Sequence, residues 1–477
     1  MAAATSDDLL SVLDQCPLNS RYWAVFGLLS AVGVVDFFDF FSVGFLVAVI
    51  GPQWHLTYGA VAAILLGGGI GAIVGSLAGG ALGDLWGRKA MVVGGTFICA
   101  IGAAAIAVIP NGAWVLFAVL RFFVGFGLGA SFAPATTMVV ELTPTRHRTV
   151  VSSLFVLSAS VGGFLASATV AALLGLIGWR GIAALGAVPV LVGVGTLLAV
   201  PESARWLTAK GRFEEARAAV AKLLHLPPSE VPLPAATPAA PPRASLAELY
   251  ARPALFWMTL LAWGGASTAA YGMSLWGPTI IAQLMHISVN QAAHFFVYVS
   301  AAGILGKVLF SFAAPLLGRR RLGQIHGFAT FLALAAAAYF HSLLIGGVSI
   351  FVIALAATDF FNAGGFSNLA PYTPEAYGVR MGARASGLGQ GANGVGKILG
   401  PLSLAVIAGT SNVLKPAATE AAVFPAFMFL ACCGLVIGLA FTFLARETHG
   451  KAVPQDAEAS APVAVPVATT FGGGLRQ

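Results

Sequence analysis

Charged residues are what this 477-residue sequence lacks most. Asp, Glu, Lys and Arg make up 9% of it, whereas a soluble globular chain carries about 25%. The 18 acidic and 25 basic residues are too few to cover a water-facing surface of this size, and 58% of the residues are hydrophobic. This composition excludes a soluble enzyme, a nucleic-acid-binding protein and a disordered chain. It predicts a membrane protein that crosses the lipid bilayer many times.

Other features are also scarce. The four cysteines, of which Cys432 and Cys433 are adjacent, do not form a disulfide framework. The sequence has no Gly-x-x-x-x-Gly-Lys-Ser/Thr loop, so ATP is not the expected energy source. The eight histidines are scattered and form no cluster with cysteine that is typical of a metal site. We therefore expect no metal and no other cofactor. No nucleophile–base set is visible, so a membrane enzyme is not expected either.

What the sequence does contain is a series of apolar runs. A helix needs about 20 such residues to cross a bilayer core of about 30 Å. Twelve runs meet this requirement: 22–50, 59–82, 90–109, 114–140, 149–177, 182–200, 253–282, 291–317, 323–343, 348–371, 385–410 and 421–445. The predicted fold is therefore an all-α polytopic membrane protein with twelve transmembrane helices in two six-helix bundles.

One long polar segment separates the two sets of six runs. The expected organisation is an N-terminal tail (1–21), a first bundle (22–200), a central loop (201–252), a second bundle (253–446) and a C-terminal tail (447–477). Residues 211–226 have the pattern of a short amphipathic helix, and seven prolines between Pro227 and Pro242 are typical of an extended linker.

The basic residues are distributed unevenly between the two sides of the predicted bundle. Three of the 25 fall inside spans, two (Arg180 and Lys415) fall in loops on one side, and 20 fall on the other side. Loops rich in Lys and Arg face the cytoplasm, so both termini are expected there. No Asn-x-Ser/Thr sequon occurs, which argues against a glycosylated exterior without excluding a eukaryote, and the expected location is a bacterial inner membrane.

Several motifs carry a resemblance to a known family. The loop after the second run reads Gly80-Ala-Leu-Gly-Asp84-Leu-Trp-Gly87-Arg88-Lys89, and the fourth run has Arg121 followed by Gly125, Gly127 and Gly129. Both resemble motifs of the major facilitator superfamily. Three further segments resemble motifs shared by its sugar porters and metabolite:proton symporters: Glu141-Leu-Thr-Pro144 with Arg146 and Arg148, Pro201-Glu202-Ser203-Ala-Arg205-Trp206-Leu207, and Tyr372-Thr-Pro374-Glu375 with Arg384.

The first run narrows the resemblance. Asp36-Phe-Phe-Asp39, preceded by a tail that contains Leu13-Asp14 and Pro17-Leu18-Asn19, is similar to the aromatic-acid and metabolite:proton symporters. Two positions depart from the pattern. Lys397 stands where those relatives often have Arg, and the second-half copy of the loop motif has Pro315 in place of Asp84.

The resemblance implies a secondary active transporter. Such a protein would use the proton gradient to carry a small organic anion, an aromatic or other carboxylate, by alternating access of the two bundles, and would function as a monomer. It also implies a charge cluster that is made in one state and broken in the other. The gating residues would be Asp84, Gly87, Arg88, Glu141, Arg148, Glu202, Arg205, Glu375 and Arg384.

Charged residues inside the spans are costly in lipid and indicate function. There are six: Asp36, Asp39, Arg121, Lys307, Asp359 and Lys397. Asp36 and Asp39 share one helix face, and Arg121 is the cation expected to hold one of them ionised while the other takes up a proton. Protonation would leave the belt of six charges net positive, and an anionic substrate would neutralise it. A static network of ion pairs is the alternative.

Candidate substrate contacts lie mainly in the second half. Lys307 and Lys397 are the cations available for a carboxylate, although either could instead pair with Asp359. Further candidates are aromatic or polar, and the aromatic ones could also be ordinary span filler: Phe37, Tyr271, Trp276 and Asn362.

The second run places glycines four residues apart, at Gly67, Gly71, Gly75 and Gly79. Such a stripe allows close approach of a neighbouring helix, either within the chain or in a dimer.

Two other functions remain open from the sequence. A sugar or polyol:proton symporter is favoured by the Pro201–Leu207 motif, although the membrane lysines and aspartates do not support it. A transport-inactive membrane sensor would need a substantial signalling extension, whereas residues 447–477 are short and of low complexity.

Overall fold

The computed structural model of the chain describes residues 8–233, 246–345, 348–378 and 381–448. The expected proline-rich linker falls largely in 234–245, and the expected C-terminal tail begins at 447, so both lie mostly outside the described residues.

All twelve expected spans are helical. The first half contains α2 (Ser20–Gln53), α3 (Tyr58–Trp86), α4 (Arg88–Ala107), α5 (Trp114–Leu142), α6 (Arg148–Leu185) and α7 (Pro189–Ala199). The second contains α11 (Pro253–Leu284), α12 (Val289–Leu317), α13 (Arg319–Tyr339), α14 (Ile350–Tyr377), α15 (Gly382–Ala408) and α16 (Pro416–Phe443).

The fifth and sixth spans run into each other. Gly178, with φ 65°, breaks the helical conformation inside α6, so that the sixth span begins directly after it and continues into α7. Among the residues that the structure describes, ten helical stretches are long and apolar enough to cross a membrane, and one of them, Val150–Ala199, holds both of these spans. These ten stretches therefore account for eleven spans. The 32-residue α11, which contains no charged residue, is the remaining one and brings the number of spans to twelve.

Short elements connect the spans. They are α1 (Leu9–Gln15), η1 (Thr145–His147), α8 (Ala204–Ala209), α9 (Phe213–Leu224), η2 (Pro228–Glu230), α10 (Leu246–Tyr250) and a hairpin of β1 (Leu344–Ile345) with β2 (Val348–Ser349). The amphipathic helix predicted at 211–226 is confirmed as α9. The hairpin was not predicted, and it shortens the ninth span, which ends at Tyr339.

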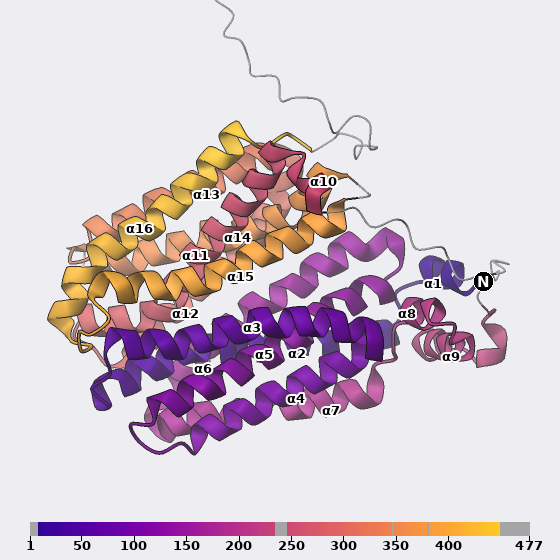
Figure 1. Cartoon of the computed structure of the whole chain (residues 1–477), viewed down its shortest axis with the longest axis horizontal. Coiled ribbons are helices and arrows are strands. Elements are labelled where there is room, and N and C mark those ends of the chain that lie inside the picture. Colours follow the sequence, from indigo (N-terminus) through magenta and orange to yellow (C-terminus); the bar gives the residue numbers. More distant parts are fainter. Residues whose placement is uncertain (1–7, 234–245, 346–347, 379–380, 449–477) are drawn as a thin grey trace, which may run out of the picture.

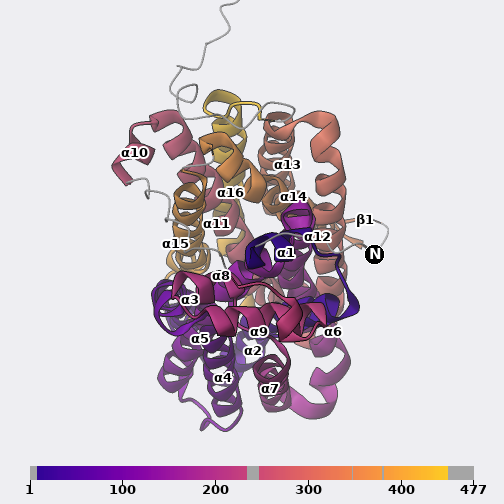
Figure 2. The same cartoon turned by 90° about the vertical axis from the view of Figure 1, so that its right-hand side faces the viewer.

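The two sets of six helices form two bodies that meet at one end of the molecule and separate toward the other (Figure 1). The separated end carries α1, α8 and α9, which lie across the ends of the first-half helices in Figure 2. Because Arg88, Arg148 and the run Arg319–Arg321 are also found there, we call it the basic end. The other end is called the joined end.

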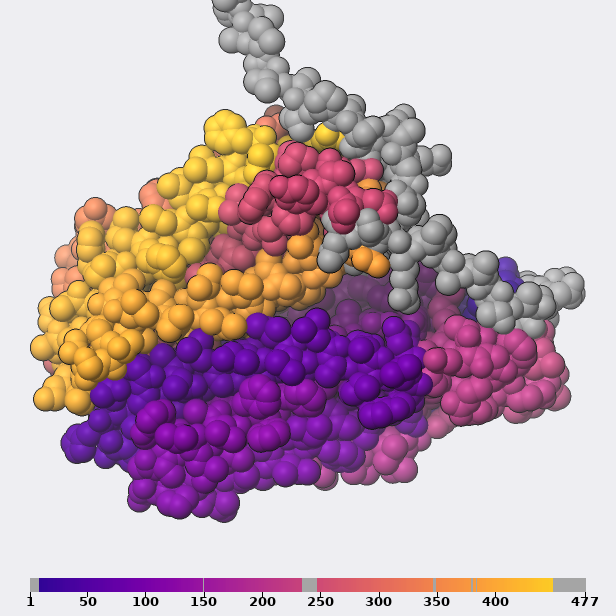
Figure 3. Space-filling view, in the orientation of Figure 1, coloured from indigo at the N-terminus to yellow at the C-terminus, as the bar shows by residue number. Residues whose placement is uncertain are grey.

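Hydrogen bonds cross between the halves at the joined end. The Tyr58 amide donates to the Asn412 carbonyl over 2.9 Å, and the Leu414 amide donates to the Leu56 carbonyl over 2.9 Å. The hydroxyls of Tyr58 and Thr419 are 2.6 Å apart. The ion pairs Arg88–Asp84, Arg148–Asp14 and Arg319–Glu375 at the basic end, in contrast, each join residues of the same half. Figure 3 shows the hollow between the halves at that end.

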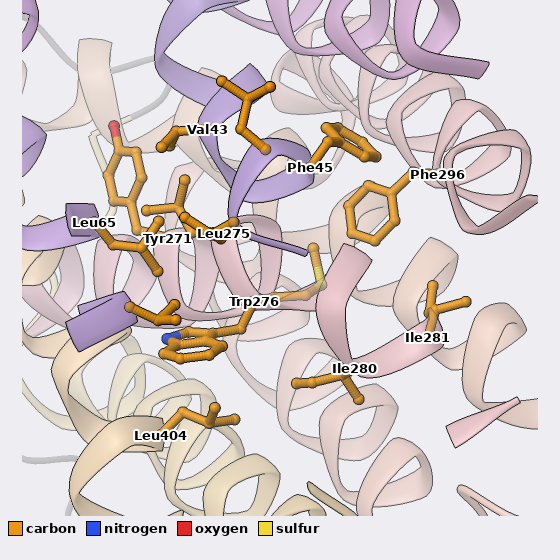
Figure 4. Close-up of a cluster of buried hydrophobic side chains, with 14 of the residues drawn as sticks. Val43, Phe45, Leu65, Tyr271, Leu275, Trp276, Ile280, Ile281, Phe296 and Leu404 are labelled. Carbon is orange, nitrogen blue, oxygen red and sulfur yellow. The ribbon is translucent and has the colours of Figure 1, made fainter. Parts of the chain in front are cut away.

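A packed core lies between the halves near the joined end (Figure 4). Trp276 and Leu275 of α11 are completely buried there, together with Phe45 of α2 and Leu404 of α15. This apolar contact closes that end of the hollow, since buried apolar side chains pack closely together.

The glycine stripe of α3 packs against α5 of the same chain. A Cβ added at Gly71 or Gly75 would lie 2.0 Å from the carbonyl oxygen of Phe122 or Phe126, one turn apart on α5. Gly125 of α5 packs equally closely on Gly68. The stripe therefore allows close packing of two helices inside the first half, which is the first of the two alternatives that the sequence left open.

Candidate functional site

A cavity of about 210 Å³ lies between the halves. For comparison, an apolar cavity of about 150 Å³ in another protein binds benzene, so there is room for a small single-ring molecule. The first-half wall is aromatic because Phe37, Phe41 and Phe45 follow each other at four-residue spacing on one face of α2. The Phe41 and Tyr271 rings are nearly parallel, with centroids 6.2 Å apart.

The charged and amide side chains of the cavity wall come from the second half. They are Lys307 of α12, Asp359 and Asn362 of α14, and Gln390 and Asn393 of α15. Lys307, at 8% exposure, donates to the carbonyl oxygen of Val156 on α6 over 3.4 Å, which links the two halves across the cavity. Asp359 is the nearby anion, and its carboxylate packs against Gly303, where a Cβ would lie 2.1 Å from Oδ2. Lys307 thus lies between a carboxylate and a backbone oxygen.

Lys397 of α15 has a different environment. Its Nζ is 5.4 Å from the centroid of the Tyr271 ring and 5.7 Å from that of Phe40, which is the geometry of a cation–π contact. No carboxylate forms an ion pair with it among the described residues. The ammonium group is therefore held by ring faces just behind the cavity wall.

Arg121 and Asp39 form a buried ion pair inside the first half. Arg121 Nη1 is 2.8 Å from Asp39 Oδ2, and the side chains are 1% and 8% exposed. The same guanidinium also approaches the carbonyl oxygens of Asp39 and Phe40 at 3.4 Å. An arginine in this position can satisfy several acceptors at once because its five N–H groups form a planar fork.

Asp36, one turn before Asp39, has no counterion among the described residues. Its side chain is completely buried, and its Oδ2 accepts a hydrogen bond of 2.5 Å from the Ser131 hydroxyl. Within the described part of the chain, its Oδ1 accepts no bond from a nitrogen or oxygen, and the neighbouring group is the Cys99 thiol. A buried carboxylate without a cation is costly, which distinguishes Asp36 from its ion-paired neighbour Asp39.

Both aspartates point away from the cavity, which differs from the sequence expectation of one shared belt. They lie on the face of α2 opposite to Phe37, Phe41 and Phe45 and are enclosed by α4, α5 and the turn at Gly186. The sequence could not show this, because it gives helix faces but not which neighbour each face meets.

The remaining predicted substrate residues are placed unequally. Asn362 lines the cavity, whereas Trp276 lies outside the cavity wall, in the packed core of Figure 4, and donates its Nε1–H to the Pro401 carbonyl over 2.9 Å. Trp276 is therefore a packing residue in this conformation. A polar residue that the sequence analysis missed, His326 of α13, is completely buried behind Asn362.

At the basic end of the first half, the expected charge cluster is assembled. Arg88 Nη2 is 2.8 Å from Asp84, and Arg88 Nε is 3.6 Å from Glu141. The Glu202 carboxylate accepts from the Lys89 amide at 3.2 Å and so caps the start of α4. Gly87, with φ 107°, leaves room for this carboxylate, since a Cβ there would lie 2.3 Å from Glu202 Oε2. Burial raises the pKa of Glu202 above its usual range.

Arg148 and Arg205 share a partner that the sequence analysis did not assign. Asp14, at the end of α1, is 3.1 Å from Arg148 and 2.8 Å from Arg205, and it accepts from the Thr145 hydroxyl. Although burial alone would raise the pKa of Asp14, its hydrogen bonds with Arg205 and Thr145 and the two positive charges hold this pKa below its usual range. The position of Asp14 directly before the Pro17-Leu18-Asn19 motif is the signal that could have found it.

The second half has a related but smaller cluster. Arg319 pairs with Glu375 over 2.9 Å, and Glu447 caps the start of α13 by accepting from the amides of Arg319 and Arg320 at 2.9 and 3.1 Å. Gly318, with φ 80°, has the same relation to Glu447 that Gly87 has to Glu202. Arg384 does not join this cluster, and no ion partner is found for it among the residues that the structure describes.

Comparison with known proteins decides the family. The family model described as Major Facilitator Superfamily matches residues 29–401. The chain belongs to the major facilitator superfamily. It is a membrane transporter and not an enzyme.

The individual relatives are transporters as well. The niacin transporter NiaP of Acinetobacter baylyi is 25% identical over 450 residues, covering 93% of this chain and 98% of that protein. The 4-hydroxybenzoate transporter PcaK of Pseudomonas aeruginosa is 30% identical over 236 residues, covering 46% of this chain and 51% of that protein. The crystal structure of a D-xylose–proton symporter has a TM-score of 0.69 at 18% identity and covers 91% of this chain. At this identity the last comparison supports the fold alone.

Proposed function

We propose that this superfamily member is a proton-coupled symporter of a small organic anion, most simply an aromatic carboxylate, that works by alternating access. The observation that carries the proposal is the charge balance around the cavity. Lys307 has one neighbouring carboxylate, Asp359, and Lys397 has no carboxylate partner among the described residues, while Arg121 is already neutralised by Asp39. With Asp36 protonated, the six membrane charges sum to one positive charge, which a bound carboxylate would cancel.

The chemistry of the walls supports an aromatic anion. A ligand ring would pack against the apolar surface that the stacked Phe41 and Tyr271 rings form, while its carboxylate would meet Lys307. Relatives named for niacin and 4-hydroxybenzoate transport agree with a ring that bears a carboxylate.

The proton would be carried next to the cavity rather than in it. Asp36, which has a hydroxyl donor but no cation, would take up the proton. The neighbouring Asp39–Arg121 pair, which joins α2 to α5, would couple this change in charge to the positions of the two helices. Because Phe37 and Asp36 are adjacent residues of α2 on opposite faces, a shift of α2 would link protonation to the cavity wall.

We further propose that the basic end faces the cytoplasm and that the structure represents an inward-open state. The excess of Lys and Arg in its loops supports this orientation. In the outward-open state, we expect the Arg88 and Arg319 clusters to contact the opposite half and the hydrogen bonds at Tyr58 and Leu414 to break.

A counterflow assay in proteoliposomes tests the proposal. Vesicles loaded with unlabelled nicotinate or 4-hydroxybenzoate should accumulate the labelled acid transiently, and an inward proton gradient should drive uptake without preloading. D-xylose and nicotinamide serve as neutral controls. Transport of the sugar without transport of either acid would contradict the anion proposal and favour a sugar porter. Acid counterflow without any uptake driven by the proton gradient would contradict only the coupling.

A further inference from the structure

A histidine in the interior of the second half contacts Asn362, a residue that lines the cavity. His326 of α13 is completely buried, and its ring lies directly on Gly365 of α14, where a Cβ would be 2.2 Å from ring atoms. Because no side chain other than hydrogen fits at position 365, the contact between ring and backbone is close. His326 Nε2 is 3.0 Å from Asn362 Oδ1.

The other half of the Asn362 amide is also held. Its Nδ2 donates to the carbonyl oxygen of Ala266 on α11 over 3.0 Å. A backbone carbonyl can only accept a hydrogen bond, so nitrogen and not oxygen must face Ala266. The amide oxygen then faces His326, and Nε2 of the histidine must carry the proton that it donates.

This chain of bonds fixes the protonation of the histidine as well. Its Nδ1 is buried and has no hydrogen-bond partner among the described residues. A proton on Nδ1 would create a buried donor without an acceptor, which is costly. The arrangement therefore fits a neutral ring with its single proton on Nε2.

Asn362 has one N–H left over. An amide nitrogen carries two hydrogens, and only one of them is used by Ala266. Asn362 is a lining residue of the cavity on the same wall as Lys307. With one hydrogen given to Ala266 and the oxygen accepting from His326, the amide nitrogen keeps one N–H that it can donate to a ligand.

We propose that His326 is a positioning residue that locks the Asn362 amide so that the second half presents an N–H donor to the substrate carboxylate. This inference rests on the proposed transport of an organic anion and names one part of its recognition. The lock excludes the flipped amide, which would place an oxygen against an anionic group and repel it. His326 itself does not touch the substrate.

One arm of the test needs no substrate. Nitrogen NMR of histidine-labelled protein, with the His326 signal identified by its absence in His326→Phe, should show a neutral ring protonated on Nε2 at pH 7. Asn362→Leu should remove this preference. A signal from a ring protonated on Nδ1, or from an imidazolium, overturns the lock.

The second arm measures binding of benzoate and benzamide, which share a ring but differ in charge. His326→Phe keeps much of the ring volume but removes the donor, and it should weaken benzoate roughly tenfold to a hundredfold, the value of a hydrogen bond to a charged group. Benzamide, which can accept or donate, should change less than threefold. His326→Gln retains an N–H donor and should restore most of the benzoate affinity. His294→Phe, at an exposed position of α12, is the matched control.

The outcomes separate this inference from the proposed function. If the wild-type protein binds benzoate and His326→Phe binds it equally well, the positioning role is wrong while anion transport stands. If His326→Phe weakens both ligands equally and His326→Gln does not rescue, the residue is merely structural and the inference fails. If the wild-type protein binds neither benzoate nor any acid of the counterflow assay, the proposed function fails, and the role of Asn362 fails with it.

Discussion

Arg121 Nη1 lies 2.8 Å from Asp39 Oδ2, and both side chains are closed off from solvent inside the first half. Removing one partner of a buried pair leaves an uncompensated charge, which costs about 3–5 kcal/mol. The neighbouring Asp36 has no such partner, so the two aspartates on one helix face are chemically unequal. This difference suggests that Asp36 carries the proton and that Asp39 stays ionised, a distinction that the sequence pattern alone does not make.

Replacement of Arg121 should damage transport severely. Arg121→Ala strands Asp39, and Arg121→Lys restores the charge but not the planar fork that also reaches the Asp39 and Phe40 carbonyls. We expect less than about a tenth of wild-type uptake for Arg121→Ala and incomplete recovery for Arg121→Lys. Arg212→Ala, which removes an exposed guanidinium paired with Glu215, is the control. Wild-type uptake by Arg121→Ala in proteoliposomes would refute the importance of the pair.

The two aspartates should respond differently to neutralisation. Asp36→Asn mimics the protonated form and should abolish proton-driven accumulation while leaving acid counterflow largely intact. Asp39→Asn should impair both, because it leaves the Arg121 guanidinium buried without its anion. The measurement compares counterflow with gradient-driven uptake for each variant. Full gradient-driven accumulation by both variants would remove the proton-carrying role from this pair.

The lysines of the cavity region should determine recognition of the substrate's charge. Lys307→Met or Lys397→Met should weaken binding of a transported acid by about 1.5–3 kcal/mol, the value of a hydrogen bond to a charged group. That loss corresponds to roughly tenfold to a hundredfold in the dissociation constant. The matched neutral amide should be nearly unaffected, and Lys397→Arg should keep the preference for the acid. Equal loss for acid and amide, measured by titration of purified protein, would contradict the assignment.

The contact between α3 and α5 should tolerate no added side chain. Gly75→Val would place its Cβ 2.0 Å from the Phe126 carbonyl oxygen, whereas a Cβ at Gly80 would have no atom within 4 Å. We expect the first variant to lose several degrees in melting temperature, since overpacking costs about 1–3 kcal/mol, and the second to remain stable. Thermal unfolding in detergent distinguishes them. Equal stability would mean that the helices can move apart at no cost.

The joined end should open once in every transport cycle. Cysteines introduced at Thr57 and Val413, which face each other in an isolated β-bridge, would form a disulfide across the halves. Oxidation should block uptake, and reduction should restore it. Oxidised wild-type protein, with its four native cysteines, controls for unrelated thiols. Continued uptake with a fully formed cross-link would contradict alternating access through this end.

Much of the architecture was predictable because the position of each helix follows from the pattern of its own residues. The twelve apolar runs, the amphipathic α9 and the glycine stripe of α3 all follow from local pattern. Which neighbour each helix face meets does not follow from local pattern. Asp36 and Asp39 point away from the cavity, and Trp276 lies in the core between the halves. Residues such as Asp14, His326 and Glu447 were missed because their partners lie far away in the chain.

The cap that Glu447 places on α13 has a practical consequence. The residues after the last span are not all dispensable, since Glu447 holds two backbone amides of a helix that begins 128 positions earlier in the chain. Shortening the chain before Glu447, or fusing a rigid tag directly to α16, would leave the first backbone amides of α13 without their acceptor. It would also remove the contact that fixes the backbone of Arg319, the residue that pairs with Glu375. A purification tag or fluorescent fusion should therefore follow Thr448, and a stop introduced after Phe443 should behave as a mutation of the basic end rather than as a harmless trim.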